Sequence, residues 1–252
     1  TTADNRGVLL FGGYQWDAMS GAEIAQGHNS AFVDKQNRSF VVYHTRFSNG
    51  GEGHQVRVHQ LFLNDEGWLM AAPFEFDGET ITDAAIASKA SIADADIAGD
   101  YQFMRHQYGQ NTKAKAFETP VNITLHADGT ITGAENGTWK RIAGTDYIHL
   151  TINDVVYRGV LVKQTIDYTN IPAIAISALS SSSGSVALGQ NSFTYQQEVW
   201  AVKADAKAAI KYTVNNLTLP FADGATLNAA PSLPTQGKMG ANISWTSSDT
   251  SI

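Results

Sequence analysis

The stretch that decides the fold runs from residue 27 to residue 62 and contains GHNSAF (27–32), FVVYHTRF (40–47) and GHQVRVHQLF (53–62). These three apolar runs are spaced like the strands of an antiparallel sheet, and short polar segments that favour turns separate them. Four of the seven histidines of the chain lie in this stretch. The pattern therefore predicts one sheet with histidines along its edge.

Strand patterns continue through most of the chain. Apolar and polar side chains alternate over residues 121–125, and Asp128-Gly129 then predicts a tight hairpin turn. The alternation returns over residues 147–162, 171–179 and 194–202. Local hairpins with consistent alternation predict a closed antiparallel β-barrel of about a hundred residues, an ordinary size for one domain.

Composition changes at two places along this all-β pattern. Residues 81–96 are rich in Ala and Asp and poor in aromatic side chains, which predicts a connector with room for a short helix. From Asp205 onward the pattern changes again, with the short strings LTLP (217–220) and ISWTSSD (243–249). We therefore expect four segments, over residues 1–80, 81–96, 97–204 and 205–252.

Charge and composition exclude several classes of partner. The chain has 252 residues, a formal net charge of -7 and no cysteine. An acidic chain lacks the clustered Lys and Arg that neutralise phosphates, so neither a nucleic acid nor an anionic membrane is an expected partner. The absence of cysteine excludes disulfides and thiolate metal sites. No apolar run approaches the roughly 20 residues that a membrane-spanning helix needs.

The strings GHNSAF, FVVYHTRF and GHQVRVHQLF, together with GWLMAAP (67–73), closely resemble the last blade of the five-bladed β-propeller in arabinan-degrading enzymes of glycoside hydrolase family 43. GDYQF (99–103) is similar to the start of the β-barrel that follows the propeller in many of these enzymes. The segment from residue 217 to residue 249 resembles the opening of a bacterial immunoglobulin-like module. The resemblance implies an all-β chain with a last blade of an incomplete propeller (1–80), a connector (81–96), a C-terminal β-barrel (97–204) and a truncated immunoglobulin-like segment (205–252).

This resemblance also implies a function. Its members are secreted enzymes that hydrolyse 1,5-linked α-L-arabinan of pectin with inversion and with calcium as cofactor. Earlier blades supply their catalytic carboxylates, so we expect this chain to be inactive unless a missing N-terminal segment or a second polypeptide completes the propeller. A stand-alone carbohydrate-binding or adhesive β protein is the alternative. The sequence does not separate endo from exo cleavage.

His28 is the candidate metal residue. It lies between Gly27 and Asn29 at the start of a predicted strand, where a small neighbour allows close approach of a ligand. Spacing alone favours a buried imidazole that is hydrogen-bonded to the main chain. The resemblance implies instead that His28 faces the propeller axis and contacts calcium, although calcium prefers oxygen ligands. His54 and His59 lie five residues apart, so we expect them to face opposite sides and to have structural roles.

Substrate contacts are predicted at two residues. Arg46 lies two residues after His44, so both point to one face, which is either a polar tunnel wall or ordinary surface. Trp16 precedes the axial strand, and an aromatic face packs well against sugar C–H groups. Glycoside hydrolysis normally needs two carboxylic groups. The carboxylates of the predicted blade lie mostly in turns, so we name no catalytic residue.

Overall fold

A computed structural model of the chain describes residues 8–106, 115–181, 186–188, 191–193 and 196–248. The N-terminal part forms a four-stranded antiparallel sheet in the order β1-β2-β3-β4. Its strands are β1 (Glu23–Val33), β2 (Ser39–Phe47), β3 (Gln55–Leu63) and β4 (Leu69–Ala71). Short polar turns join neighbouring strands, as the sequence predicts.

Eight further strands close into an antiparallel barrel in the order β10-β11-β14-β5-β6-β7-β8-β9. These strands are β5 (Gly99–Arg105), β6 (Val121–Leu125), β7 (Thr130–Gly133), β8 (Gly137–Arg141), β9 (Tyr147–Ile152), β10 (Val155–Thr165), β11 (Pro172–Ser180) and β14 (Glu198–Ala204). A separate hairpin pairs β12 (Val186–Leu188) with β13 (Asn191–Phe193). The predicted all-β class and the closed barrel are confirmed.

Two short helices occupy the stretch between the sheet and the barrel, α1 (Asp83–Ser88) and α2 (Asp94–Ile97). Thr82 caps α1 by accepting a hydrogen bond from the Ala85 amide. Each helix buries one isoleucine, Ile86 in α1 and Ile97 in α2. Both helices are therefore anchored by apolar side chains.

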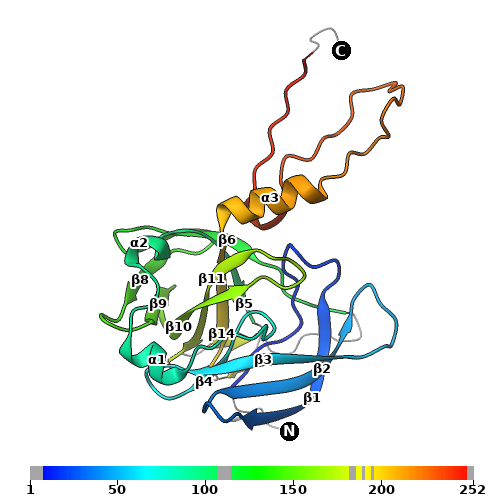
Figure 1. Cartoon of the computed structure of the whole chain (residues 1–252). Helices are drawn as coiled ribbons and strands as arrows, with labels where there is room; N and C mark the ends of the chain where they lie inside the picture. Colours follow the sequence, from blue (N-terminus) through cyan, green and yellow to red (C-terminus); the bar gives the residue numbers. More distant parts are fainter. Residues whose placement is uncertain (1–7, 107–114, 182–185, 189–190, 194–195, 249–252) are drawn as a thin grey trace.

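Helix α3 (Ala206–Asn216) follows the barrel and is capped by Asp205. The chain then runs as an extended loop away from the barrel, with one 3-10 turn, η2 (Lys238–Gly240), packed on α3 (Figure 1). No strand longer than an isolated bridge forms among the described residues after Ala204. The immunoglobulin-like module proposed for this segment stays a prediction.

The barrel encloses one apolar core. Its buried members come from seven of the eight strands and include Phe103, Ile123, Leu150, Leu161 and Ile176, and β8 adds the partly buried Trp139. Side chains of this size fill the interior of an eight-stranded barrel. The barrel is thus a packed domain.

A second apolar core lies between the sheet and the outer wall of the barrel, and we call it the seam. Strand β14 shows how it arises, because Val199 and Ala201 belong to the barrel core while Trp200 and Val202 belong to the seam. Successive side chains of a strand point to opposite faces. A strand that is apolar on both faces must be covered on both, and the sheet covers the outer one.

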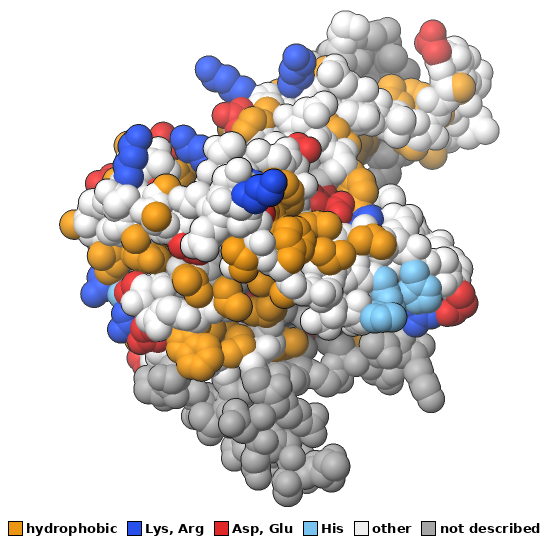
Figure 2. All heavy atoms as spheres, turned by 60° about the horizontal axis from the view of Figure 1, so that its bottom comes forward, with side chains coloured by type: hydrophobic (Ala, Val, Ile, Leu, Met, Phe, Trp, Pro, Cys, Tyr) orange, Lys and Arg blue, Asp and Glu red, His pale blue; other side chains and the backbone are white. Residues whose placement is uncertain are grey.

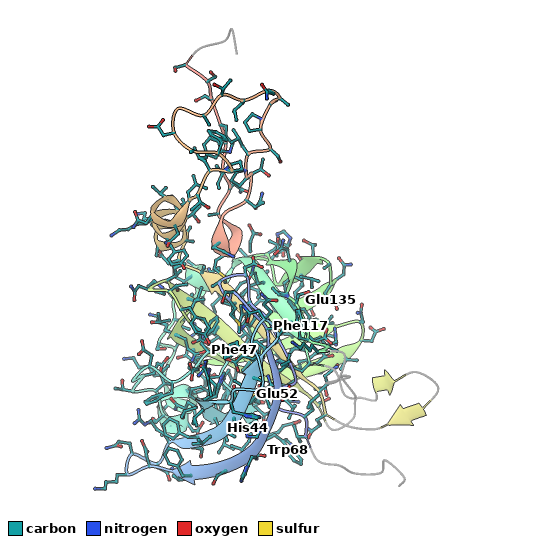
Figure 3. All side chains as sticks on the ribbon, turned by 90° about the vertical axis from the view of Figure 1, so that its right-hand side faces the viewer. His44, Phe47, Glu52, Trp68, Phe117 and Glu135 are labelled. Carbon is teal, nitrogen blue, oxygen red and sulfur yellow. The ribbon has the colours of Figure 1, made fainter. Side chains whose placement is uncertain are left out.

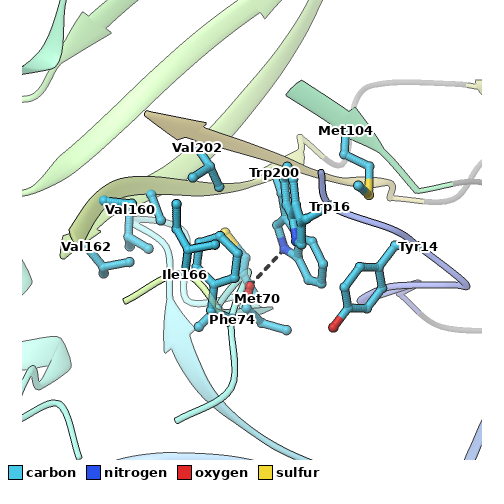
Figure 4. Close-up of a cluster of buried hydrophobic side chains, with 14 of the residues drawn as sticks. Tyr14, Trp16, Met70, Phe74, Met104, Val160, Val162, Ile166, Trp200 and Val202 are labelled. Carbon is cyan, nitrogen blue, oxygen red and sulfur yellow. Dashed lines mark hydrogen bonds between the residues drawn. The ribbon is translucent and has the colours of Figure 1, made fainter. Parts of the chain in front are cut away.

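Trp200 lies at the centre of the seam. Its ring stacks on Trp16 at 6.3 Å and meets Tyr14 edge-on at 5.2 Å. Its indole N–H donates to the Ala71 carbonyl of β4 at 3.0 Å (Figure 4). Sheet and barrel therefore share a core and a hydrogen bond. Within the described residues, no helix has the length and apolar character needed to cross a membrane.

We expect Gly159→Ala to destabilise the protein. A Cβ on Gly159, in the middle of β10, would lie 2.3 Å from the Ser177 carbonyl and 2.5 Å from the Ala178 Cβ. Overpacking of this kind costs about 1–3 kcal/mol of unfolding free energy, measurable by urea titration.

Gly51→Ala is the matched control, because nothing lies within 4 Å of its added Cβ. Its effect should stay within about 0.5 kcal/mol. Equal effects of the two substitutions would contradict the strand packing described for β10.

Candidate functional site

His28 lies at an irregularity of the edge strand β1. The pairing register between β1 and β2 shifts on both sides of Gly27, and the backbone of His28 has a φ of 47°. Such bulges bend a strand and re-aim side chains. The imidazole is exposed in this chain, so it is not packed into the core of the sheet or of the barrel.

Three histidines form a row beside this bulge. The rings of His28 and His44 are 6.1 Å apart, and those of His44 and His54 are 4.5 Å apart. Figure 2 shows these pale blue side chains gathered on one face. Partial desolvation and the neighbouring imidazoles lower the pKa of His44, since positive charge on one ring disfavours it on the next.

The histidine row alone does not make a calcium site. Calcium takes six to eight oxygen ligands, whereas the row offers ring nitrogens. Among the residues that the structure describes, no group of three or more His, Cys, Asp or Glu side chains is arranged to hold a metal ion. His28 is thus placed to give at most one ligand, and the other ligands would have to come from elsewhere.

Arg46 lies further along β2, and its guanidinium pairs with the exposed carboxylate of Glu52. Both residues line a hollow of about 490 Å³ together with Phe47 and Lys115. Figure 3 shows His44, Phe47 and Glu52 along the same side of the molecule. The structure therefore brings Arg46 and the histidine row to one region, as their spacing predicts.

Trp16 requires a correction. The sequence predicts a substrate contact, but the side chain is completely buried in the seam. It packs between Trp200 and Phe74, with ring centroids at 6.3 Å and 5.6 Å. A sugar ring cannot reach it, so Trp16 is a core residue. The prediction failed because an outer barrel wall that needs covering is not visible in the local sequence around residue 16.

Buried charges connect the strands of the sheet on the seam side. Arg57 Nε lies 3.1 Å from Glu23 Oε1 and 3.4 Å from Glu75 Oε2. Burial raises the pKa of Glu23, and the Arg57 charge opposes this shift. Removing one partner of a buried pair leaves an uncompensated charge, which is why such pairs are sensitive to substitution.

His59 has the structural role that its spacing predicts. Its ring is fully buried, its Nδ1 lies 2.7 Å from the Ala72 carbonyl, and its Nε2 lies 3.0 Å from the Tyr43 hydroxyl. A carbonyl only accepts, so Nδ1 carries the proton. Burial lowers the pKa of His59 to about 4, and the imidazole is neutral.

Glu198 is the most deeply buried carboxyl group of the seam. Its Oε1 accepts hydrogen bonds from the Ala71 amide at 2.8 Å, the Ser177 hydroxyl at 2.7 Å and the Trp200 indole at 2.9 Å. Among the described residues, Oε2 has no hydrogen-bond partner. Burial raises the pKa of Glu198 well above the usual range, which favours the neutral carboxyl, and Oε1 can accept all three bonds in that form.

Eight carboxylates of the described sheet region have a structural partner. These pairs are Asp17 with Gln102, Glu23 and Glu75 with Arg57, Asp34 with Arg38, Glu52 with Arg46, Asp65 with His149 and Arg158, Glu66 with Arg158, and Glu79 with the Asp77 amide.

Sequence reasoning missed Glu198 and Arg57. A signal existed for Glu198, because the run EVWAVKA (198–204) is apolar on both faces of its strand and so indicates burial on both. Arg57 carries no comparable signal. Its partner Glu23 lies 34 residues away and becomes a neighbour only through the fold.

The fold on which the site lies is a filled eight-stranded β-barrel with a four-stranded sheet packed on its outer wall. Residues 73–189 match the family model of the C-terminal lipocalin-like domain of glycoside hydrolase family 43. The extracellular endo-α-(1→5)-L-arabinanase of Thermotoga petrophila is 39% identical over 175 residues, which cover 65% of this chain and 34% of that protein. An extracellular endo-α-(1→5)-L-arabinanase of Bacillus subtilis is 37% identical over 162 residues, or 63% of this chain and 32% of that protein.

Solved structures agree with these sequence matches. The crystal structure of the Thermotoga petrophila endo-1,5-α-L-arabinanase superposes with a TM-score of 0.62 and 34% identity, covering 80% of this chain and 40% of that one. The crystal structure of a family 43 glycoside hydrolase of Bacillus licheniformis superposes with a TM-score of 0.63 and 32% identity. The superposition covers 77% of this chain and 38% of that one. The chain spans about a third of the length of its sequence relatives. The resemblance to the C-terminal part of family 43 arabinanases is confirmed for the matched residues.

Glu198→Gln should change how stability depends on pH. A carboxyl whose pKa is raised in the folded state contributes stability below its ordinary pKa of 4.5, and this contribution is lost as pH rises toward the folded-state value. The variant cannot titrate. Its unfolding free energy relative to the unmodified protein should therefore rise above pH 4.5, by up to about 1.4 kcal/mol per pH unit.

The test compares the unfolding free energies of the variant and the unmodified protein at each pH. The comparison is needed because buried histidines change the stability of both proteins with pH, in the direction opposite to Glu198. His59 and His106, with pKa values lowered to about 4 and about 3, destabilise the fold as pH falls below 6.5. Glu52→Gln, which makes the same substitution at an exposed carboxylate, is the matched control. A Glu198→Gln difference that is flat from pH 4.5 to 8 would rule out the neutral carboxyl.

Proposed function

We propose that this chain is the C-terminal portion of a secreted glycosidase that hydrolyses 1,5-α-L-arabinan with inversion and with the help of calcium. One observation carries the proposal. The sheet and the barrel together superpose on endo-1,5-α-L-arabinanase at 34% identity, so the likeness includes the relation between the two and not only the barrel. The extracellular relatives support secretion.

The four-stranded sheet would be the last blade of a propeller. Its seam face is covered by the barrel, whereas side chains elsewhere on the sheet are open to solvent, including Phe32 at 48% and Val56 at 66%. Among the described residues, β1 pairs with β2 alone, apart from an isolated bridge between Glu23 and Tyr14 at its start. Open edges and apolar side chains mark surfaces that another element covers. Neighbouring blades from a longer polypeptide or a second chain are the partners that fit.

In this proposal the catalytic carboxylates and the residues of this chain have different roles. Inverting hydrolysis needs an acid to protonate the leaving oxygen and a base to activate water. The sheet carboxylates serve as structural partners, so the acid and base would come from the other blades. Arg46 would contribute a substrate contact from the open side of β2, and His28 would give one ligand to a calcium ion whose oxygen ligands lie outside this chain.

A chimera tests this proposal. We expect a Thermotoga petrophila arabinanase whose matching C-terminal residues are replaced by this chain to release oligosaccharides from linear 1,5-α-L-arabinan. The 252-residue chain alone should release none. Reducing-sugar release measures both. Hydrolysis by the isolated chain, or an inert chimera that is correctly folded, would contradict the proposed role.

His28→Ala in the chimera should lower both bound calcium and turnover by about tenfold or more, the usual range for groups that support a metal site. Inductively coupled plasma analysis measures the calcium. His126→Ala is the matched control, because His126 bonds to Thr132 on the barrel. Calcium content that is undiminished in His28→Ala would refute the metal contact.

A further inference from the structure

A hollow of about 300 Å³ opens where the turn between β10 and β11 meets the segment after β4. The turn contributes residues 165–169, and the segment contributes Glu75, Phe76 and Asp77. The β10–β11 hairpin is yellow-green in Figure 1. Neither part of this hollow has a role in the function proposed above.

Tyr168 presents an aromatic ring at this hollow. The residue is 52% exposed. Its backbone has a φ of 63°, a conformation that is rare for residues other than Gly, Asn and Asp. Strain at an exposed aromatic residue is a reason to look for function.

A hydrogen bond to the hydroxyl group holds the Tyr168 side chain in place. Arg57 Nη2 donates to the Tyr168 hydroxyl at 3.0 Å, and Arg57 itself is fixed by Glu23 and Glu75. The turn is closed by hydrogen bonds from the Ile166 amide to the Ile171 carbonyl and from the Thr169 amide to the Ile166 carbonyl. A ring fixed before binding loses little freedom when a ligand stacks on it.

Carboxyl groups line the same hollow as the Tyr168 ring. Both oxygens of Asp167 accept from the Glu75 amide, at 3.1 Å and 3.3 Å. Each carboxylate oxygen can accept a further bond. The Glu75 carboxylate is partly exposed beside Arg57, and Asp77 lies on the same wall. The hollow therefore combines an aromatic face with several acceptors that are held in fixed positions.

We propose that this hollow binds one sugar unit of a neutral polysaccharide, with its C–H face on the Tyr168 ring and its hydroxyls donating to Glu75 and Asp167. Stacking on an aromatic ring and donation to fixed carboxylates is the combination that a polyol can satisfy. Burial and the neighbouring Glu75 and Glu23 raise the pKa of Asp167 well above its usual range, which favours its neutral form, so the hollow suits a neutral ligand that donates hydrogen bonds. That the polysaccharide is arabinan rests on the function proposed above.

The chain as it stands can be tested by isothermal titration with linear 1,5-α-L-arabino-oligosaccharides. Tyr168→Asn removes the ring but tolerates the left-handed backbone, and it should weaken binding about tenfold. Tyr168→Phe keeps the ring and should retain binding to within a few-fold. Trp68→Ala removes another exposed aromatic side chain, 43% exposed, and should change nothing. Unchanged thermal midpoints show that each variant is folded.

Three further outcomes are distinct. Binding of xylo-oligosaccharides but not arabino-oligosaccharides, with the same dependence on Tyr168, would support the sugar site and overturn arabinan as its ligand. Binding that Tyr168→Asn leaves intact would overturn the site. Binding of tetramethylammonium in place of any saccharide would overturn it as well, because a ring among carboxylates also suits an organic cation. The activity of the chimera is independent of these results.

Discussion

The rest of the structure depends on covering the outer face of β14. Trp200 and Val202 point away from the barrel core, and exposure of a tryptophan and its apolar neighbours to water is unfavourable by about 25 cal/mol per Å² of apolar surface. The four-stranded sheet covers them, and the Trp200 indole bonds to the Ala71 carbonyl of its last strand. Glu198 adds an acceptor for the Ala71 amide, so both backbone groups of that residue are satisfied by β14.

This contact decides which surfaces stay open. Because one face of the sheet is used by the seam, the histidine row and the edge of β1 remain on the outside. The barrel thus acts as a support that presents the sheet. A fold does not itself define a function, which depends on the residues at the exposed site. Here those residues are the histidine row and Arg46.

Much of the fold could be predicted from sequence, because most of the strands pair with their neighbours along the chain. Alternation and the Asp128-Gly129 turn specify hairpins between neighbouring segments. For this reason the sequence predicts an antiparallel sheet and, after it in the chain, a closed antiparallel barrel. The seam could not be predicted, since it joins residues 14–16 to residue 200. For the same reason Trp16 was misplaced, whereas the run 198–204, apolar on both faces of its strand, carries a local signal for the burial of Glu198. The metal role of His28 rests on family resemblance alone and stays a prediction, and the structure adds that His28 lies at a register shift of β1.

Native-state hydrogen exchange measured by NMR tests the central claim that sheet and barrel form one cooperative unit. If the seam joins them, the slowest amides of β2 and β3 should exchange with the same opening free energy as those of β10 and β11, equal to the free energy of global unfolding. Exchange of the β2 and β3 amides at a much lower free energy, while the barrel amides stay protected, would contradict the account.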